Sequence, residues 1–270
     1  MKRFTKIMLI IAVVCFVLGT GIIMAATAMG GSPSGIRKQL RNQNYHSRKV
    51  TVESMESVPV ESGDSGELEI AVQAGAIRII QEAGLESVEV RNLSRHAKLE
   101  RKRDGDSIEL EFSKKRGIHH LFAPNDVAAV VVIPENHGFR SISLDIDAGA
   151  VLADDLTADT LELDMGAGAA ELQNILADTV LVECSAGAVD FQGEIQKRLD
   201  VEVDAGAVEM KLVGDPEDYN YHVDVNAGGV EVDGREFDAL SRDQRLQHEG
   251  AEKEIYLECN AGGIEITFER

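Results

Sequence analysis

One short phrase recurs along this chain and constrains its fold more than any other feature. An Ala-Gly pair followed by Ala or Gly occurs seven times, set inside alternating apolar and polar residues. Three successive spacings are 19 residues, and the next two are 22 and 34. Equal spacing of equivalent residues is the signature of a structural repeat. The central glycines are Gly75, Gly149, Gly168, Gly187, Gly206, Gly228 and Gly262.

The residues that flank each glycine agree between the copies. Apolar residues occupy the positions seven, five and three before the glycine, and all but one copy have Val or Ile two after it. This period-two alternation predicts two short strands per copy, each with one buried face. Glycine is expected to form the corner between them because it accepts a positive φ, with the preceding alanine filling the inner bend.

Copies at this spacing would stack in register, each strand pairing with its counterpart about 4.8 Å above or below. One copy cannot close a core, but several stacked copies bury a continuous one. We therefore expect an all-β fold, a single-stranded β-solenoid of the β-helix or β-roll kind with coils of about 19 residues. An antiparallel sandwich with glycine turns is the alternative, which explains the alternation but not the equal spacings.

Residues 1–29 are expected to form a membrane anchor, one N-terminal transmembrane helix. Lys2, Arg3 and Lys6 precede an uncharged run over residues 7–29, long enough to cross a bilayer core of about 30 Å. A cleaved signal peptide with a small-residue site at 26–28 is the alternative. Both place the bulk of the chain outside the cytoplasm, so the expected localisation is a single-pass protein of the cell membrane.

The charge distribution divides the rest of the chain. Residues 30–49 form a basic flexible linker without an acidic residue, and residues 50–140 form an N-terminal β part that holds the first repeat. Residues 141–270 form regular acidic coils, with 31 acidic against 8 basic residues. Such a surface repels polyanions, which excludes nucleic acid as a partner. The stretch from Gly234 to Gly250 interrupts these coils and is a candidate partner-binding loop.

Two cysteines fall within the coils, and both lie three residues before a corner glycine. Cys184 and Cys259 are therefore expected to point into the core, on coils three repeats apart. At about 4.8 Å per coil this separation exceeds the Cα distance that a disulfide allows. The sequence predicts two core thiols and neither a bridge nor a metal pair.

Stacking would align acidic side chains into outward rows. The row four before the glycine is the candidate metal site, for weak Ca²⁺ binding: Asp145, Asp164, Glu183, Glu202, Asp224 and Glu258. Two further rows lie two before it (Asp147, Asp204, Asn226 and Asn260) and three after it (Glu171, Asp190, Glu209, Glu231 and Glu265). Neighbouring charges would repel by roughly 0.9 kcal/mol even at the dielectric constant of water. A divalent cation, a cationic partner or plain solvation would relieve this repulsion; no other cofactor is expected.

The stretch from Ile133-Pro134-Glu135 through Ser141–Leu144 to Asp147-Ala148-Gly149-Ala150, with its echoes, resembles the bacterial putative-adhesin β-strand-repeat family, a domain of unknown function in envelope proteins. The resemblance covers roughly residues 65–268, although the family corner is Ser-Gly-Asp or Ser-Gly-Asn rather than Ala-Gly-Ala. It implies a surface location and roles in adhesion or envelope stress, and it implies no catalytic residue.

Together these observations predict a non-enzymatic, membrane-anchored extracytoplasmic module that binds an unknown protein or envelope polymer, or has a structural role in the cell envelope. A regulator or sensor of a membrane-embedded partner in envelope stress is the alternative. A β-helix enzyme that acts on a polysaccharide is a third possibility, because acidic clefts occur on such folds. Evenly repeated acids suit an extended binding surface better than a catalytic pair with shifted pKa values.

Overall fold

A computed structural model describes residues 56–59, 66–104, 107–114, 127–135, 138–237 and 243–269. All of them belong to one compact unit, residues 52–270. The expected membrane anchor (1–29) and basic linker (30–49) lie outside the described residues. Within the part of the chain that is described, no helix is long and apolar enough to span a membrane.

The described residues are almost entirely β-strand, which confirms the predicted all-β class. A single short 3₁₀ helix, Pro216–Asp218, interrupts the strands of this part of the chain. The strands are β1 (Glu56–Pro59), β2 (Glu67–Val72), β3 (Gly75–Glu82), β4 (Ser87–Arg91), β5 (Ala97–Asp104), β6 (Ser107–Lys114), β7 (Val127–Pro134), β8 (Phe139–Asp154), β9 (Thr157–Cys184), β10 (Ala188–Val203), β11 (Ala207–Val213), β12 (Tyr219–Val225), β13 (Gly229–Val232), β14 (Arg235–Phe237), β15 (Gln244–Leu246), β16 (Lys253–Cys259) and β17 (Gly263–Glu269).

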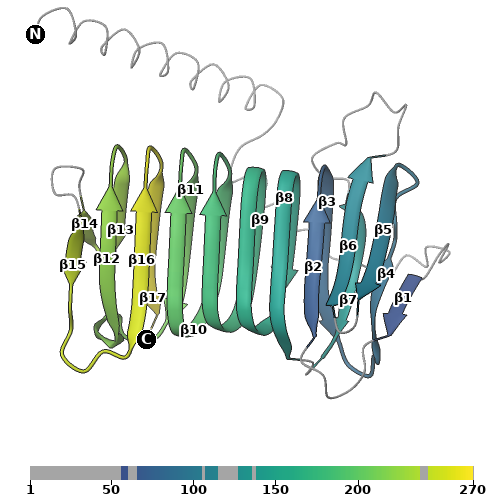
Figure 1. The fold of residues 1–270 in the computed structure, drawn as a ribbon, viewed down its shortest axis with the longest axis horizontal. Helices are drawn as coiled ribbons and strands as arrows, with labels where there is room; N and C mark the ends of the chain where they lie inside the picture. Colours follow the sequence, from purple (N-terminus) through teal and green to yellow (C-terminus); the bar gives the residue numbers. More distant parts are fainter. Residues whose placement is uncertain are drawn as a thin grey trace, which may run out of the picture. The chain divides into compact units, whose positions relative to one another are not determined.

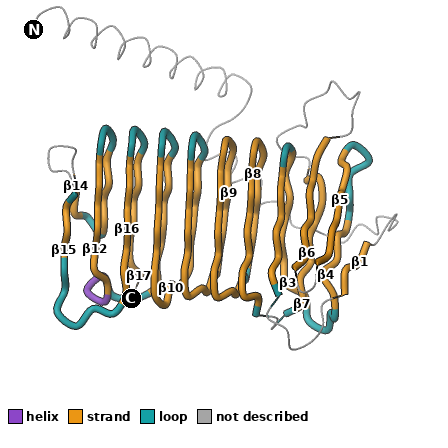
Figure 2. Tube along the Cα trace, viewed as in Figure 1, coloured by secondary structure: helices purple, strands orange, loops and turns teal. Residues whose placement is uncertain are grey.

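The strands wind into stacked coils, as Figures 1 and 2 show. We call the side built from the segments before each corner glycine the first face, and the side built from the segments after it the second face. Neighbouring coils pair in parallel with equivalent residues opposite each other, for example Leu144 with Leu163 and Val182 with Val201. The predicted in-register, solenoid-like stacking is therefore present.

The core lies between the two faces and is filled by the apolar residues of the alternating pattern. Ile142, Leu163 and Val201 from the first face and Phe191 and Ile266 from the second are each at most 2% exposed. Every coil adds such side chains to one continuous core cluster. A coil is therefore stabilised by its neighbours rather than by contacts of its own.

The order of the coils in space differs from their order in the sequence. β16 pairs with β10 on one side and with β12 on the other, and β17 likewise lies between β11 and β13. The coil of residues 253–269 is thus inserted between two coils that follow each other in the chain, as Figure 1 shows for the yellow strand β16. At the other end, the β2–β3 coil lies between β8 and the β6–β7 coil.

Antiparallel strands cover the outermost coil at each end. β5 pairs with β6 and β4 pairs with β7 at one end, while β15 pairs with β12 and β14 with β13 at the other. β14 and β15 come from the stretch Gly234–Gly250, whose described part therefore caps the sheet edges. Covering an edge in this way removes unpaired backbone groups that would invite aggregation.

The corner glycines are required mainly by space, which corrects the expected reason. Only Gly75 and Gly168 have a positive φ among the seven, at 114° and 140°. A Cβ on Gly149 would lie 2.3 Å from the Gly75 carbonyl oxygen, and one on Gly206 2.7 Å from that of Gly187. Stacked corners therefore approach too closely for any side chain. The preceding alanines do not fill an inner bend either, because Ala148, Ala167, Ala186, Ala205, Ala227 and Ala261 are exposed.

Both cysteines of the coils are buried and unbridged, as predicted. Their separation differs from the expectation, because Cys184 pairs with Val203 and Val203 pairs with Cys259. The inserted position of the last coil leaves one coil between the two thiols, so they are two coils apart rather than three. Two steps of about 4.8 Å still exceed the Cα separation that a disulfide tolerates.

Candidate functional site

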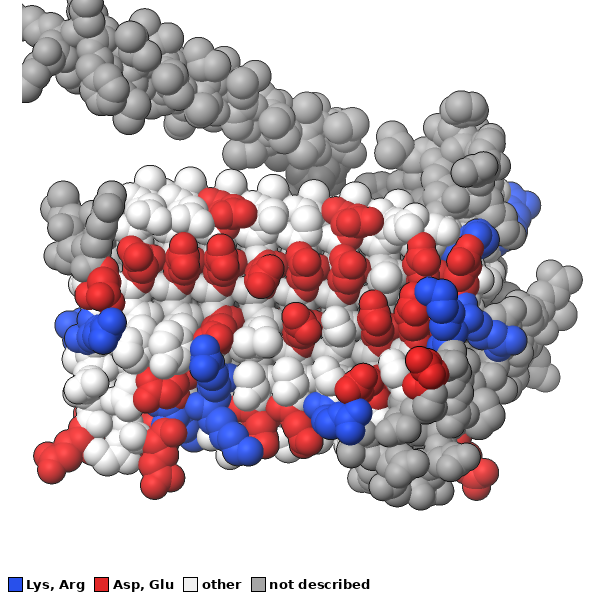
Figure 3. All heavy atoms as spheres, viewed as in Figure 1, with Lys and Arg blue, Asp and Glu red and all other residues white. Residues whose placement is uncertain are grey.

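The most regular feature of the surface is a row of acidic side chains along the first face. The pairs Asp145–Asp164, Glu183–Glu202, Glu202–Glu258 and Glu258–Asp224 are opposite each other on paired strands. We call these residues the first-face carboxylate row; in spatial order they are Asp145, Asp164, Glu183, Glu202, Glu258 and Asp224. Figure 3 shows the acidic side chains lined up across this face.

The alternation of the strands holds these carboxylates outside. Each lies between two inward apolar residues, such as Val201 and Val203 on either side of Glu202, which are at most 2% exposed. A shift of one residue would bury the charge and expose the core residue, so the hydrophobic pattern fixes the row. The structure therefore brings together all six residues of the predicted row, and only the order of the last two is reversed.

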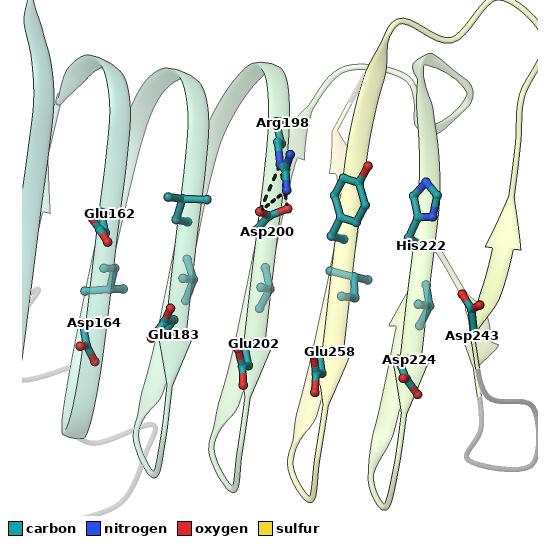
Figure 4. Close-up of a pocket in the computed structure, with 17 residues that line it drawn as sticks. Glu162, Asp164, Glu183, Arg198, Asp200, Glu202, His222, Asp224, Asp243 and Glu258 are labelled. Carbon is teal, nitrogen blue, oxygen red and sulfur yellow. Dashed lines mark hydrogen bonds and ion pairs between the residues drawn. The ribbon is translucent and has the colours of Figure 1, made fainter.

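An open groove with a cavity volume of about 390 Å³ runs along this row. It crosses five successive coils and reaches the β15 cap, as Figure 4 shows. Its aliphatic lining residues are the half-buried Leu181 and the buried Leu163, Val182, Val201, Val223 and Leu257. Its acidic lining residues are Glu162, Asp164, Glu183, Asp200, Glu202, Asp224, Asp243 and Glu258.

One cationic side chain, that of Arg198, lies among these acids. The Arg198 guanidinium donates to both carboxylate oxygens of Asp200, with N–O distances of 2.7 and 3.1 Å. It also lies over the Tyr256 ring, 4.5 Å from the ring centroid. The pKa of Arg198 is raised, first by its hydrogen bond to Asp200. Arg198 is therefore held charged within the groove.

Tyr256 is also stacked on His222, whose ring centroid is 4.5 Å away at an interplanar angle of 7°. The imidazole Nε2 lies 3.3 Å from Glu254 Oε2. Three coils thus supply a stack of Arg198, Tyr256 and His222 beside the carboxylate row. The repeat pattern does not predict this stack. Tyr256 and His222 both lie six residues before a corner glycine, whereas Arg198 lies eight before one. The pairing of Tyr256 with His222 depends on the coil of residues 253–269 lying beside β12.

Burial and acidic neighbours affect Asp145, at one end of the row. The pKa of Asp145 is raised, first by burial and then by the negative charges of Asp147 and Asp164. At the other end, Asp224 Oδ1 is buried and accepts no hydrogen bond. The Asp145 carboxylate is thus held in the row although burial and its acidic neighbours both disfavour its charged form.

The row two before the glycine differs because two neighbouring coils have asparagine there instead of an acid. Asn226 Nδ2 donates to Asn260 Oδ1 at 2.7 Å, and Asn260 Nδ2 donates to Asp204 Oδ1 at 3.0 Å. These three residues are therefore linked by hydrogen bonds across the inserted coil. Asp147 of the same predicted row is exposed and lies beyond this chain of bonds.

The second face carries a matching row. Glu171 pairs with Asp190, Asp190 with Glu209, Glu209 with Glu265 and Glu265 with Glu231. All five residues were predicted to align, and the β14 cap adds Glu236 opposite Glu231. We call these six residues the second-face carboxylate row. Both faces of the stack are therefore acidic.

The predicted Ca²⁺ site remains a prediction. Among the residues that the structure describes, no group of three or more His, Cys, Asp or Glu side chains converges closely enough to hold a metal ion. Each carboxylate of the first-face row comes from its own coil, and the row extends along the stack instead of closing around a point. This geometry places many equivalent negative charges along one line of the surface.

Comparison with known proteins confirms the resemblance to the β-strand-repeat family. Residues 65–194 match the family model described as Toastrack DUF4097. The match ends within β10, although the coils continue in the same register to residue 269. No curated protein is significantly similar to the chain.

The chain is similar to solved structures of bacterial proteins. One, a putative cell adhesion protein from Clostridium sporogenes, has a TM-score of 0.47 at 15% identity and covers 80% of this chain and 99% of that chain. Putative adhesins from Bacteroides fragilis and Parabacteroides distasonis have TM-scores of 0.31 and 0.32 at 13% identity. They cover 79% and 80% of this chain and 97% of their own chains.

Proposed function

Because residues 65–194 match the Toastrack family and the described coils carry rows of carboxylates, we propose that this protein is a non-enzymatic binding module of the bacterial cell envelope. In this proposal residues 1–29 anchor the chain in the cell membrane and the coils lie outside the cytoplasm. The partner is a protein or envelope polymer that carries repeated positive charges.

The first-face carboxylate row carries the proposal. Its members repeat at the strand spacing of about 4.8 Å on a rigid sheet, so their separation does not depend on loop conformation. A partner with one positive charge would contact only one or two carboxylates of the row. A partner with many charges would engage several steps at once, and its weak contacts would add to a useful affinity.

An enzymatic role has less support. Catalytic acids and bases need pKa values matched to their task, usually through burial beside a specific partner. In the described groove the acids are repeated evenly, and most are exposed. Arg198 and Asp200 neutralise each other by a two-point ion pair, which suits a structural role. Even repetition along an open groove favours binding.

The test is cross-linking of the full-length protein to its neighbours in intact cells. One variant neutralises the first face (Asp164→Asn, Glu183→Gln and Glu202→Gln), and a matched variant neutralises the second face (Glu171→Gln, Asp190→Asn and Glu209→Gln). Both lose three charges, so a general charge effect would act on both equally. We expect the same partner to be captured by the wild type and the second-face variant and lost from the first-face variant.

Two results would contradict the proposal. Equal capture by all three proteins would remove the first-face row from the interface. Capture that persists after the coils are deleted, and that needs only residues 1–49, would favour a regulator that acts through the anchor and the basic linker.

A further inference from the structure

The coil of residues 253–269, which we call the inserted coil, fills a slot between two coils that are consecutive in the chain. One wall of the slot is formed by residues 198–203 of β10 together with β11, and the other by β12 with β13. Val201 pairs with Leu257, which pairs with Val223. On the second face Val208 pairs with Ile264, which pairs with Val230.

The slot fits a segment that has the same residue pattern as the coils of this chain. Its occupant must place apolar side chains inward at alternate positions, as Ile255, Leu257 and Ile266 do at no more than 2% exposure. It must also have glycine at the corner. A Cβ on Gly262 would lie 2.3 Å from the Gly206 carbonyl oxygen, and a Cβ on Gly228 would lie 2.3 Å from that of Gly262.

A short connection leads into the inserted coil. β15 pairs with one edge of β12 and ends at Leu246, whereas β16 begins at Lys253 and pairs with the opposite edge of β12. Residues 247–252 therefore cross from one side of β12 to the other. Gly250 is exposed in this connection and has a φ of 87°, a conformation that glycine adopts without steric cost.

The walls of the slot precede the inserted coil in the sequence. β12 and β13 leave the ribosome before β16 and β17, since synthesis runs from the N-terminus. The inserted coil can pair with both walls only if they are not paired with each other when it arrives. An open slot presents unpaired strand edges on both walls and both faces, and unpaired edges accept any strand of matching pattern.

We propose that the slot also accepts the inserted coil of a second copy of this chain, so that two copies exchange residues 253–269. The exchanged dimer keeps the contacts between coils. His248 keeps its hydrogen bonds with Asn220 and Tyr219 of its own β12, and only the path of residues 249–252 changes. Such an exchange is a low-cost route to a dimer because the two forms bury the same surfaces. In the dimer, each first face would receive its Tyr256 and Glu258 from the other copy.

The experiment uses register-specific cysteines in full-length protein that carries Cys15→Ser. Glu202 and Glu258 are exposed cross-strand partners, so cysteines at these two positions lie within disulfide distance when the slot is filled. A Glu202→Cys chain and a Glu258→Cys chain are unfolded in urea with detergent, mixed, refolded at several concentrations and oxidised. The control mixture replaces Glu202→Cys by Glu183→Cys, which lies two coils from Glu258.

Exchange predicts a disulfide-linked heterodimer from the Glu202→Cys mixture that exceeds the control and rises with protein concentration. A single chain with both Glu202→Cys and Glu258→Cys should close the same bond internally after refolding at high dilution. If this double variant closes but the mixture gives no more heterodimer than the control, the proposal is wrong.

Linker length provides a second, independent readout. Deletion of Glu249 and Gly250 shortens the connection from six residues to four, which should disfavour the return of the inserted coil to its own slot. Size-exclusion chromatography should then show more dimer, whereas a Gly-Ser insertion at the same place should show more monomer. Dimer fractions that do not change with linker length would also overturn the proposal. They would indicate an ordinary surface contact, which does not depend on this connection.

Discussion

The His222 imidazole lies parallel to the Tyr256 ring, with centroids 4.5 Å apart and an interplanar angle of 7°. The two residues are 34 positions apart in the sequence, yet they face each other on paired strands, because the inserted coil places β16 against β12. On its other side Tyr256 is covered by Arg198 from β10. One aromatic side chain therefore links the inserted coil to both walls of its slot.

Replacing Tyr256 tests this link. Tyr256→Ala removes the ring stack and the cation–π contact and should lower the free energy of unfolding by about 1–2 kcal/mol. Tyr256→Phe keeps both contacts and should stay within about 0.5 kcal/mol of the wild type. Urea denaturation measures both variants. Equal losses for alanine and phenylalanine would assign the effect to the hydroxyl instead of the stack.

The corner glycine Gly228 and its neighbour Gly229 allow a direct comparison. A Cβ on Gly228 would lie 2.3 Å from the Gly262 carbonyl oxygen, whereas one on Gly229 would meet nothing within 4 Å. We expect Gly228→Ala to lower the free energy of unfolding by about 3 kcal/mol or more, because backbone must move, and Gly229→Ala to be nearly neutral. Thermal denaturation of the two variants decides this, and similar midpoints would refute the spatial explanation.

The carboxylate row should respond to charge removal and to salt. Glu202 lies between Glu183 and Glu258, so Glu202→Gln removes two repulsive interactions between neighbouring carboxylates. We expect it to raise the free energy of unfolding by about 0.5 kcal/mol at low ionic strength, and the gain should vanish in about 1 M NaCl, where charges are screened. Glu162→Gln is the control because Glu162 pairs with Ser143. The same gain from both variants would mean that only net charge matters.

The raised pKa of Asp145 makes the free energy of unfolding depend on pH in the acid range. Its pKa is raised in the folded protein, by burial first and then by Asp147 and Asp164, so the folded state binds its proton more tightly than the unfolded state. Protonation of Asp145 therefore stabilises the folded protein as the pH falls through its raised pKa toward the unfolded value of 3.8. As the pH rises through that raised pKa, this stabilisation is lost. Asp145→Asn should be more stable than the wild type at pH 7, and the difference should shrink near pH 4. Parallel pH profiles of the two proteins would contradict this assignment.

Tyr219 should limit stability at high pH. Its hydroxyl donates to the Ile195 carbonyl oxygen at 3.0 Å, and burial raises its pKa from 10.0 to about 12. The unfolded state loses this proton first, so stability falls as the pH rises from 10 toward 12. Tyr219→Phe should flatten this decline, although it loses a hydrogen bond at neutral pH. Denaturation midpoints between pH 8 and 12 test the prediction, and an unchanged slope would exclude Tyr219 as the cause.

The alternation of residues was enough to predict which way each side chain points. Asp164, Glu183 and Glu202 could be assigned to one outward row because the residues between them had to be buried. The two core thiols, Cys184 and Cys259, followed from the same pattern. These predictions succeed because burial of every second residue is a local property, and a slip of one position would bury charges.

The reason for the corner glycines could not be read from one copy. Gly206 alone is compatible with a tight turn, and a positive φ was the reasonable expectation. The actual constraint is the carbonyl oxygen of Gly187 on the next coil, which becomes visible only when the coils are stacked. Glu236 joined the second-face row for a similar reason, because an antiparallel cap brings it beside Glu231.

By itself the sequence determined the all-β class, the coil length, the inward and outward rows and the alignment of equivalent residues. Only the tertiary structure decided which coil lies beside which, and with it the stack of Arg198, Tyr256 and His222. The physical reason is that the coils resemble one another: each presents the same backbone edges and the same apolar pattern, so local preferences allow many orders. The choice among them rests on long-range pairing and on the caps, which close the two ends of the sheet.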